Sequence, residues 1–267
     1  MEEVERWRRL VPSDFQFAVR AYRAITHENK LQPKAETFEA LEKMKRICRA
    51  LNADTLHLQT PPSLKLDGAS VGKLDDLVTS ADLGKIRIAL EIRSARSSEL
   101  PPELVRVMQD HGIIHCVDLS QGETPAYQSD TLYTRLFGKG SRNVYQPTDE
   151  ELAEVDHKAS SGNFEKVSMS FHFVRMYKDA ARLKIYKQTG KFPTVTKSTG
   201  LSSLDEVLSE DTRFPTTKQD LIRSQGWKLF DMREDRRMRA SDLLVKLPER
   251  TYNNSNEVMD ALCSAAR

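Results

Sequence analysis

The chain has 267 residues, of which 39% are hydrophobic and 30% charged, enough for one large domain or a domain with an appendage. Its 41 Lys and Arg residues nearly balance 39 Asp and Glu residues, for a formal net charge of +2. This balance argues against a general polyanion binder, but it leaves room for a local basic pocket. No apolar run approaches the roughly 20 residues that a membrane helix needs.

Short strand-like runs alternate with amphipathic helical stretches up to residue 190. We expect strands at residues 15–21, 54–62, 86–93, 112–120, 131–140 and 166–173. Helices are expected at residues 36–51, 71–81, 101–112, 149–159 and 176–190. This alternation predicts an α/β fold with a parallel sheet and covering helices. Because no Gly-rich phosphate loop follows the first strand, it favours a TIM-barrel-like fold over a nucleotide-binding sheet.

Beyond residue 190 the pattern changes to helices without a strand signal. A loop precedes four short helical segments, each with a Ser, Thr or Asn near its start that is suited to capping. We therefore expect a β/α domain at residues 1–190 and an all-helical extension at residues 201–267. The basic segment MREDRRMRA, residues 232–240, is interpreted as a solvated helix face within this extension.

The three cysteines, Cys48, Cys116 and Cys263, form no CxxC or CxH pair, so neither a zinc knuckle nor a disulfide framework is expected. A sparse, odd set is typical of a reducing compartment. Cys116 is interpreted as a buried, inert thiol within a strand. The N-terminal segment is charged from its second residue and does not have the pattern of a signal peptide. These features predict a cytoplasmic protein.

One face of the expected strands is polar toward the strands' carboxyl ends. In residues 55–59, for example, Leu56 and Leu58 share one face and His57 and Gln59 the other. Buried groups of this kind are costly unless they are paired or serve a ligand. Since the carboxyl ends of parallel strands meet at one edge, the pattern predicts a site there; a structural ion-pair network is the alternative interpretation. The residues concerned are Arg20, His57, Gln59, Glu91, Arg93, Asp118, Tyr133, Arg135 and His172.

Two loops at the same edge add candidates. Residues 25–29, ITHEN, follow the first strand and offer His27. Residues 138–143, GKGSRN, follow the fifth strand, where the glycines permit close backbone approach and Lys139 and Arg142 add positive charge. Such a loop suits a phosphate, and it is equally typical of an ordinary flexible connection.

The segments FQFAVRAYRAITHENKL, LHLQTPPSL, ALEIR, CVDLS and LYTRLFGKGSRNVYQPTDEEL, in this order, resemble the YecE-like family, a domain of unknown function with a TIM-barrel-like fold. Arg20 stands where the family usually has lysine. RLFGKG with YQPTDEEL resembles the archaeal branch, and the sequence from Phe214 onward resembles a small helical domain of unknown function. The positions that carry the family pattern include Phe15, Phe17, Val19, Ile25, Thr26, His27, Gln59, Pro61, Pro62, Glu91, Arg93, Asp118, Tyr133, Arg135 and Gly138.

The resemblance also implies a departure from the family. The family's first two strands have no counterpart here, and the chain begins in the helix that follows them. We expect either a wrongly assigned start codon or a natural truncation, with unpaired strand edges on both sides of the gap. Any ligand group that those strands supply would be absent.

The family's barrel is loosely similar to sugar isomerases, which implies an enzyme acting on a small anionic substrate, phosphorylated or sugar-like. In this hypothesis Glu91 or Asp118 is the general base, and His27 or His172 is the acid or an orienting partner. Guanidinium groups match phosphate or carboxylate. The expected substrate-binding residues are Arg20, Gln59, Arg93, Tyr133, Arg135 and Lys139.

Three further hypotheses stay open. A divalent metal could be held by some of Glu91, Asp118, His57 and His172, although their spacing matches no diagnostic motif. Nucleic-acid binding or processing is motivated by the cations of residues 138–143 and 232–240 and opposed by the balanced net charge. A non-catalytic ligand sensor, whose tail recruits a partner, is the third. The sequence specifies neither the reaction nor the oligomeric state.

Overall fold

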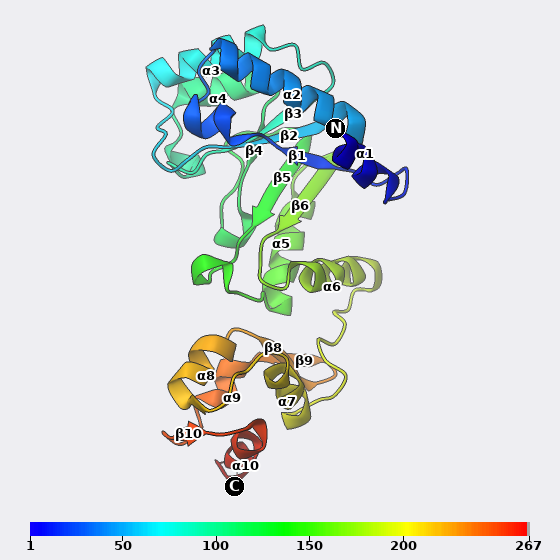
Figure 1. The fold of residues 1–267 in the computed structure, drawn as a ribbon, viewed down its shortest axis with the longest axis vertical. Coiled ribbons are helices and arrows are strands. Elements are labelled where there is room, and N and C mark those ends of the chain that lie inside the picture. Colours follow the sequence, from blue (N-terminus) through cyan, green and yellow to red (C-terminus); the bar gives the residue numbers. More distant parts are fainter. Residues whose placement is uncertain (266–267) are drawn as a thin grey trace. The chain divides into compact units, whose positions relative to one another are not determined.

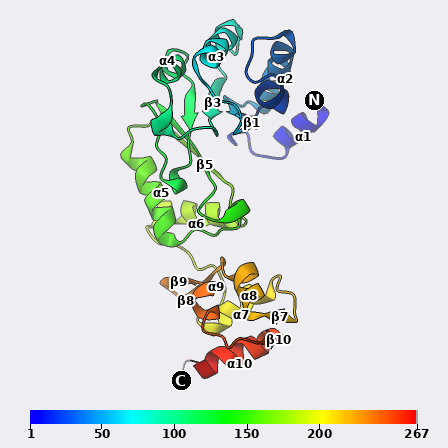
Figure 2. The same cartoon turned by 90° about the vertical axis from the view of Figure 1, so that its left-hand side faces the viewer.

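The computed structural model describes residues 1–265, which divide into two compact units, each described here by itself. Unit 1 comprises Met1–Arg135 and Ala159–Ser170, and unit 2 comprises Leu136–Lys158 and Phe171–Arg267. The ribbon is shown in two views (Figures 1 and 2). No helix of the described part of the chain is long and apolar enough to cross a membrane.

Strands and helices alternate through unit 1, as the sequence predicts. The strands are β1 (Ala18–Arg20), β2 (Thr55–Gln59), β3 (Arg87–Glu91), β4 (Ile114–Cys116), β5 (Thr131–Leu136) and β6 (Lys166–Phe171). The helices are α1 (Glu2–Arg9), α2 (Ala35–Leu51), α3 (Gly68–Ser80) and α4 (Pro102–Asp110). Short turns of helix follow three of the strands, a π-helix at Ala24–Glu28 and 3-10 turns at Ser97–Glu99 and Leu119–Gln121.

The strands of unit 1 are parallel and lie in sequence order. β1 to β4 form one sheet, in which Gln59 of β2 lies opposite Glu91 of β3, and Glu91 opposite Cys116 of β4. A parallel bridge between Val117 and Thr134 continues the order to β5, which pairs with β6. Within the described residues no pairing joins β6 to β1, so the strands form an open arc. The α/β class is confirmed, and a barrel lacking two strands stays a prediction.

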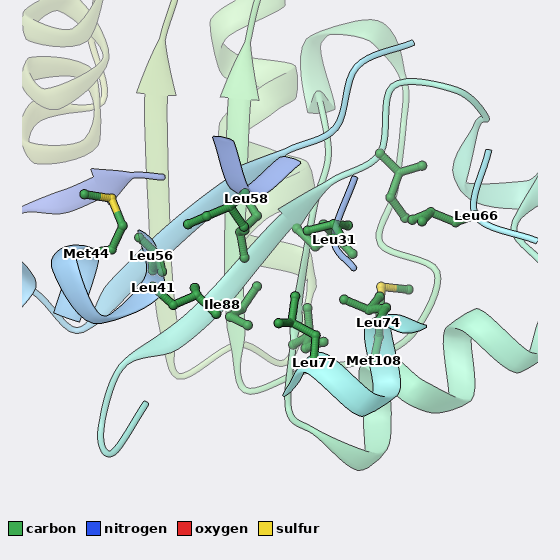
Figure 3. Packing of buried hydrophobic residues seen from close by; sticks show 14 of the residues in the cluster. Leu31, Leu41, Met44, Leu56, Leu58, Leu66, Leu74, Leu77, Ile88 and Met108 are labelled. Atoms are coloured by element: carbon green, nitrogen blue, oxygen red, sulfur yellow. The ribbon is translucent and has the colours of Figure 1, made fainter. Parts of the chain in front are cut away.

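One face of the arc is covered by α2, α3 and α4 (Figures 1 and 2). Leu56, Leu58 and Ile88 point from the strands into this layer, and they are at most 7% exposed. Figure 3 shows them beside the helix residues Leu41, Met44, Leu74, Leu77 and Met108. Each such side chain contributes roughly 1.5–3 kcal/mol on burial. Since side chains alternate along a strand, the residues between these positions face the opposite, concave side of the arc.

The first strand is shorter than expected. Hydrogen-bonded pairing with β2 begins at Ala18, opposite Thr55, which is the first residue of β2. Phe15 therefore precedes the sheet, and it is 47% exposed and packs edge-to-face on Phe17. The alternation of apolar and polar residues begins at residue 15, whereas the partner strand β2 begins opposite Ala18. The sequence pattern therefore overestimates the length of β1.

Unit 2 combines two helices that follow β5 and β6 with the C-terminal part of the chain. Most of α5 (Asp149–Ser161) lies in it, together with α6 (Met176–Thr189) and a 3-10 turn at Ser141–Asn143. A second hydrophobic core contains Leu204, Val207, Phe230 and Tyr252, all fully buried. The elements around it are α7 (Leu201–Ser209), β7 (Thr216–Thr217), α8 (Lys218–Gln225), β8 (Leu229–Arg233), β9 (Arg236–Arg239), α9 (Ala240–Leu244), β10 (Thr251–Tyr252) and α10 (Ser255–Ala265).

The expectation of an all-helical extension is wrong, because residues 216–252 contain four strands. β8 and β9 form an antiparallel hairpin, and β7 pairs with β10. Residues 232–240 therefore lie largely in the hairpin and not on a helix face. Leu229, Phe230 and Asp231 are all fully buried, so β8 lacks the apolar and polar alternation by which strands are recognised.

Candidate functional site

The concave face of unit 1 gathers polar side chains from four strands. Arg20 ends β1, His57 and Gln59 lie on β2, and Glu91 ends β3. Arg135 extends from β5 onto the same face and reaches Glu91. All of these except Arg20 are less than 10% exposed. The period of two along each strand and the parallel register place them side by side, as the sequence predicts.

Glu91 is the centre of this cluster. Its Oε1 accepts a hydrogen bond from Gln59 Nε2 at 2.7 Å, and its Oε2 lies 3.1 Å from His57 Nε2. The guanidinium group of Arg135 donates to the same Oε2. Both carboxylate oxygens are thus used within the protein, so the carboxylate holds its neighbours in place and has little capacity left to accept a substrate proton.

The charge states of the cluster follow from these contacts. Burial by itself would raise the pKa of Glu91, but the hydrogen bond from His57, the Arg135 charge and the amide of Gln59 lower it to about 2. Burial lowers the pKa of His57, so its imidazole is neutral near pH 7. The cluster then carries one carboxylate against the two guanidinium groups of Arg20 and Arg135.

Arg20 is the cation of this cluster that no carboxylate neutralises. Its Nη2 donates to Gln59 Oε1 at 2.5 Å, which is a neutral partner. Within residues 1–265 no carboxylate forms an ion pair with it, and the residue is exposed at the end of β1. An exposed guanidinium held in place by one amide keeps its remaining N–H groups available for an anion.

Tyr133 connects the cluster to a cavity. Its ring stacks on His57 with centroids 5.7 Å apart and an angle of 12° between the planes. Burial raises the pKa of Tyr133 to about 12, and among the described residues the hydroxyl group has no hydrogen-bond partner. The cavity has a volume of about 330 Å³, within the size range of small-ligand pockets. Its lining consists of residues 16–18, 54–55, 133, 166 and 168–170.

The cavity lies beside the amino ends of β1, β2 and β6, whereas the sequence predicts a pocket at the carboxyl ends. Tyr133 is the one predicted site residue in its lining, and Arg20 and Arg135 are not part of it. A ligand that used both features would therefore extend along the concave face, from the arginines past the stacked pair of His57 and Tyr133.

Three other predicted site residues of unit 1 make local contacts. The side chain of Arg93 is exposed beyond the end of β3, and its backbone N–H donates to Thr60 Oγ1 at 3.2 Å. Asp118 caps a 3-10 turn by accepting from Ser120 N at 2.9 Å. His27 lies in the π-helix, where its Nδ1 is 2.8 Å from Thr26 Oγ1. Each has a local structural contact of its own.

Two more predicted residues belong to unit 2. Lys139 forms an ion pair with Glu151 at 3.1 Å and is exposed. The ring of His172 stacks on Phe137, with centroids 4.7 Å apart. The 138–143 loop is tightly folded, since a Cβ at Gly138 would lie 2.5 Å from the Tyr145 ring and the residue has a φ of +74°. These contacts explain the glycine at 138 without a ligand.

Cys116 is a member of the site that the sequence analysis did not select. It is 2% exposed and packs with Ala89, Ile114 and Tyr133 on the concave face. A ligand atom of each of Cys116, His57 and Glu91 lies within 4.8 Å of the others, a grouping that could hold a metal ion. The signal was present in the sequence, because Cys116 shares its strand face with Asp118. By contrast, His115 lies on the other face, where its Nδ1 accepts from Ala126 N at 3.0 Å.

Together the fold and the cluster define an α/β protein whose parallel sheet carries a buried polar network on its inner face. A family model described as "Protein of unknown function DUF72" matches residues 1–191, and the chain therefore belongs to this family. The resemblance to YecE-like proteins is thereby confirmed.

Solved structures of the same family are similar to this chain. A DUF72 family protein from Thermotoga maritima matches with a TM-score of 0.53 and 20% identity, over 67% of this chain and 76% of that chain. A DUF72 family protein from Enterococcus faecalis matches with a TM-score of 0.52 and 18% identity, over 71% of this chain and 83% of that chain. At these identities the likeness concerns the fold alone. No curated protein matches the chain.

Proposed function

We propose that unit 1 binds a small anionic ligand on the concave face of its sheet and that the protein is an enzyme acting on a phosphorylated or sugar-like substrate. The observation that carries this proposal is the charge of the cluster. The guanidinium of Arg20 is held by the neutral amide of Gln59, and among the described residues no carboxylate forms an ion pair with it. A fixed guanidinium of this kind is suited to phosphate or carboxylate oxygens.

The other groups of the cluster have supporting roles in this proposal. Glu91 fixes Arg135, His57 and Gln59, and Gln59 in turn fixes Arg20. Tyr133 contributes a hydroxyl group beside a cavity that also contains the polar residues Thr55 and Ser168. These groups suit a sugar phosphate. The cation can bind the phosphate, and the hydroxyl groups and the aromatic ring can contact the sugar hydroxyls and ring carbons next to it.

The nucleic-acid alternative is less well supported. Of the basic residues in segment 232–240, Arg237 pairs with Asp149 at 2.8 Å and with Asp231 at 3.1 Å. Arg239 contacts Glu151 at 3.3 Å and donates to two backbone carbonyls. Two of the four arginines of this segment are engaged in this way and contribute little to phosphate-backbone binding, whereas Arg233 and Arg236 are exposed.

A thermal-unfolding series tests the proposal. Glucose 6-phosphate is compared with glucose and with inorganic phosphate, at equal ionic strength. Saturation at about 100 times the dissociation constant stabilises the folded state by about 2.7 kcal/mol, which raises Tm by roughly 5–10 °C for units of this size. We expect a rise with the two phosphates and none with glucose. Equal shifts with glucose, or none with any of a panel of anionic metabolites, would contradict anion binding.

Enzymatic activity is tested separately from binding. A phosphorus NMR time course of bound sugar phosphates reports isomerisation or phosphate release. We expect at least one ligand that raises Tm to be converted by the wild-type chain and not by Arg20→Gln. A ligand that binds with the expected charge preference and is never converted would instead make the protein a sensor.

A further inference from the structure

Three side chains that can act as metal ligands, those of His57, Glu91 and Cys116, lie close together on the concave face. The three residues come from adjacent parallel strands, β2, β3 and β4, and they are 3%, 9% and 2% exposed. An imidazole, a carboxylate and a thiol, each on a rigid strand, have candidate ligand atoms within 4.8 Å of one another.

The distances suit coordination of one ion. Zinc binds His nitrogen and carboxylate oxygen at about 2.0–2.2 Å and Cys sulfur at about 2.3 Å, so two ligands of a tetrahedral ion lie roughly 3.3–3.6 Å apart. His57 Nε2 and Glu91 Oε2 are 3.1 Å apart, near this value. Since all three side chains leave the same face of the sheet, a fourth coordination position would open toward the concave side.

We propose that His57, Glu91 and Cys116 bind a zinc-like divalent metal ion, with the fourth position left for an oxygen of the ligand. A set with one thiolate and one imidazole selects zinc, or cobalt as its spectroscopic substitute, and not magnesium or calcium. On binding, the metal–sulfur bond replaces the S–H bond of Cys116, whose proton leaves to solvent. His57 binds through the lone pair of Nε2, and its N–H proton moves to Nδ1.

Arg135 is the group that the metal must compete with, because its guanidinium donates to Glu91 Oε2. When the metal takes this oxygen, Arg135 loses its contact with Glu91, and the N–H group that made this contact can donate to an anion on the concave face. Metal binding and anion binding should therefore strengthen each other, as linkage requires of two coupled equilibria. This coupling rests on the proposed function, whereas the metal site itself does not.

A cobalt titration of the purified, reduced and chelator-treated full chain tests the site, without any anionic ligand. We expect one equivalent of Co²⁺ to bind with the near-ultraviolet absorption of a thiolate–cobalt bond and to be displaced by Zn²⁺. Cys116→Ala should lose this absorption, and the matched control Cys48→Ala, another buried cysteine, should keep it. Absorption that persists in Cys116→Ala, or a folded wild-type chain without stoichiometric cobalt binding, would overturn the proposal.

A second variant keeps the test decisive if Cys116→Ala fails to fold. His57→Gln removes another ligand and should weaken cobalt binding at least tenfold; unchanged affinity overturns the site. Arg135→Gln removes the competitor, so cobalt should bind at least as tightly while glucose 6-phosphate affinity falls. Cobalt binding without any sugar phosphate binding would reject the proposed function and leave the metal site standing, and the converse result would do the opposite.

Discussion

The buried charges of unit 1 and those of unit 2 are arranged in different ways. In unit 2, Arg182 pairs with Asp149 and Asp179, and Arg237 pairs with Asp149 and Asp231. Three carboxylates thus face two guanidinium groups, and both Asp179 and Asp231 have fully buried side chains. In unit 1, by contrast, the guanidinium of Arg20 is held by the neutral amide of Gln59 and is open to solvent.

The contrast indicates what each network is for. The unit 2 charges connect α5, α6 and the β8–β9 hairpin, which lie far apart in the sequence, and they are enclosed. Burial raises the pKa of Asp179, because enclosure disfavours the charged form of this carboxyl group. The unit 1 charges come from β1, β3 and β5, which belong to one series of strands that backbone pairing already joins. We infer that the first network serves the fold and the second serves a ligand, and variants should separate the two.

The largest expected effect is on the stability of unit 2. Asp231→Ala removes the acceptor of the backbone N–H groups of Val195 and Thr196, each at 2.8 Å, and one partner of Arg237. Breaking such a buried network costs about 3–5 kcal/mol. Urea unfolding followed by Trp227 fluorescence in a Trp7→Phe background reports on unit 2.

Asp235→Ala, in the exposed turn of the same hairpin, is the control and should change stability by less than about 0.5 kcal/mol. If Asp231→Ala were equally harmless, or if it abolished sugar phosphate binding in a folded chain, the assignment of this network to the fold would fail.

The second effect concerns Glu91 and acid. Its pKa of about 2 lies below the ordinary value of 4.5, so the group stabilises the folded state above about pH 4.5 and loses this contribution as pH falls toward 2. The shift corresponds to about 3 kcal/mol. Glu91→Gln in the metal-free chain should be less stable than wild type by about this amount at pH 6, with a difference that shrinks steadily in urea melts at pH 4 and pH 3. A constant difference would mean that charge is not what Glu91 contributes.

The third effect is on binding alone. Arg20→Gln removes a charge-assisted hydrogen bond worth about 1.5–3 kcal/mol, so calorimetry should show sugar phosphate affinity falling roughly ten- to hundredfold. Stability should stay nearly constant, because the side chain is exposed. Arg46→Gln, an exposed arginine on α2, is the matched control and should bind as wild type does. Equal losses in both variants would point to general charge and not to a site.

The smallest effect is expected at the edge of the cavity. Lys166 pairs with Asp54 at 2.6 Å, and the two side chains are 32% and 59% exposed. Solvent screens such a pair, so Lys166→Met should change the free energy of unfolding by no more than about 1 kcal/mol. A loss of several kcal/mol in the urea melt would show that this ion pair holds β6 against β2.

Much of unit 1 could be predicted from the sequence, and the reason is periodicity. The alternation of Leu56 and Leu58 with His57 and Gln59 predicts both a strand and its two faces. Parallel pairing then brings Gln59 beside Glu91. The grouping of Arg20, Glu91 and Arg135 follows from the same rule. The alternation of side chains along a strand does not reveal which hydrogen bonds a carboxylate accepts. The sequence therefore suggested Glu91 as a general base, whereas in the structure both of its carboxylate oxygens have partners within the protein.

The rest could not be predicted because its signals are not local. In β8 both faces are buried, and Asp231 is stabilised by backbone groups of residues 195 and 196, which no spacing rule connects to it. Asp118 and His27 follow strands as site residues do, yet a cap and a π-helix turn engage them locally. No second cysteine lies near Cys116 in the sequence, so the sequence does not mark it as a metal ligand. Only its spatial neighbours, Glu91 on β3 and His57 on β2, indicate this role.

The most direct test of the central claim is NMR mapping of the side chains during titration with glucose 6-phosphate. The claim predicts that the largest guanidinium shifts occur at Arg20 and Arg135, accompanied by shifts of the Tyr133 ring, with Arg46 and Arg237 unchanged. Saturating ligand that leaves Arg20 and Arg135 unshifted, or that perturbs only residues 138–143, would contradict it.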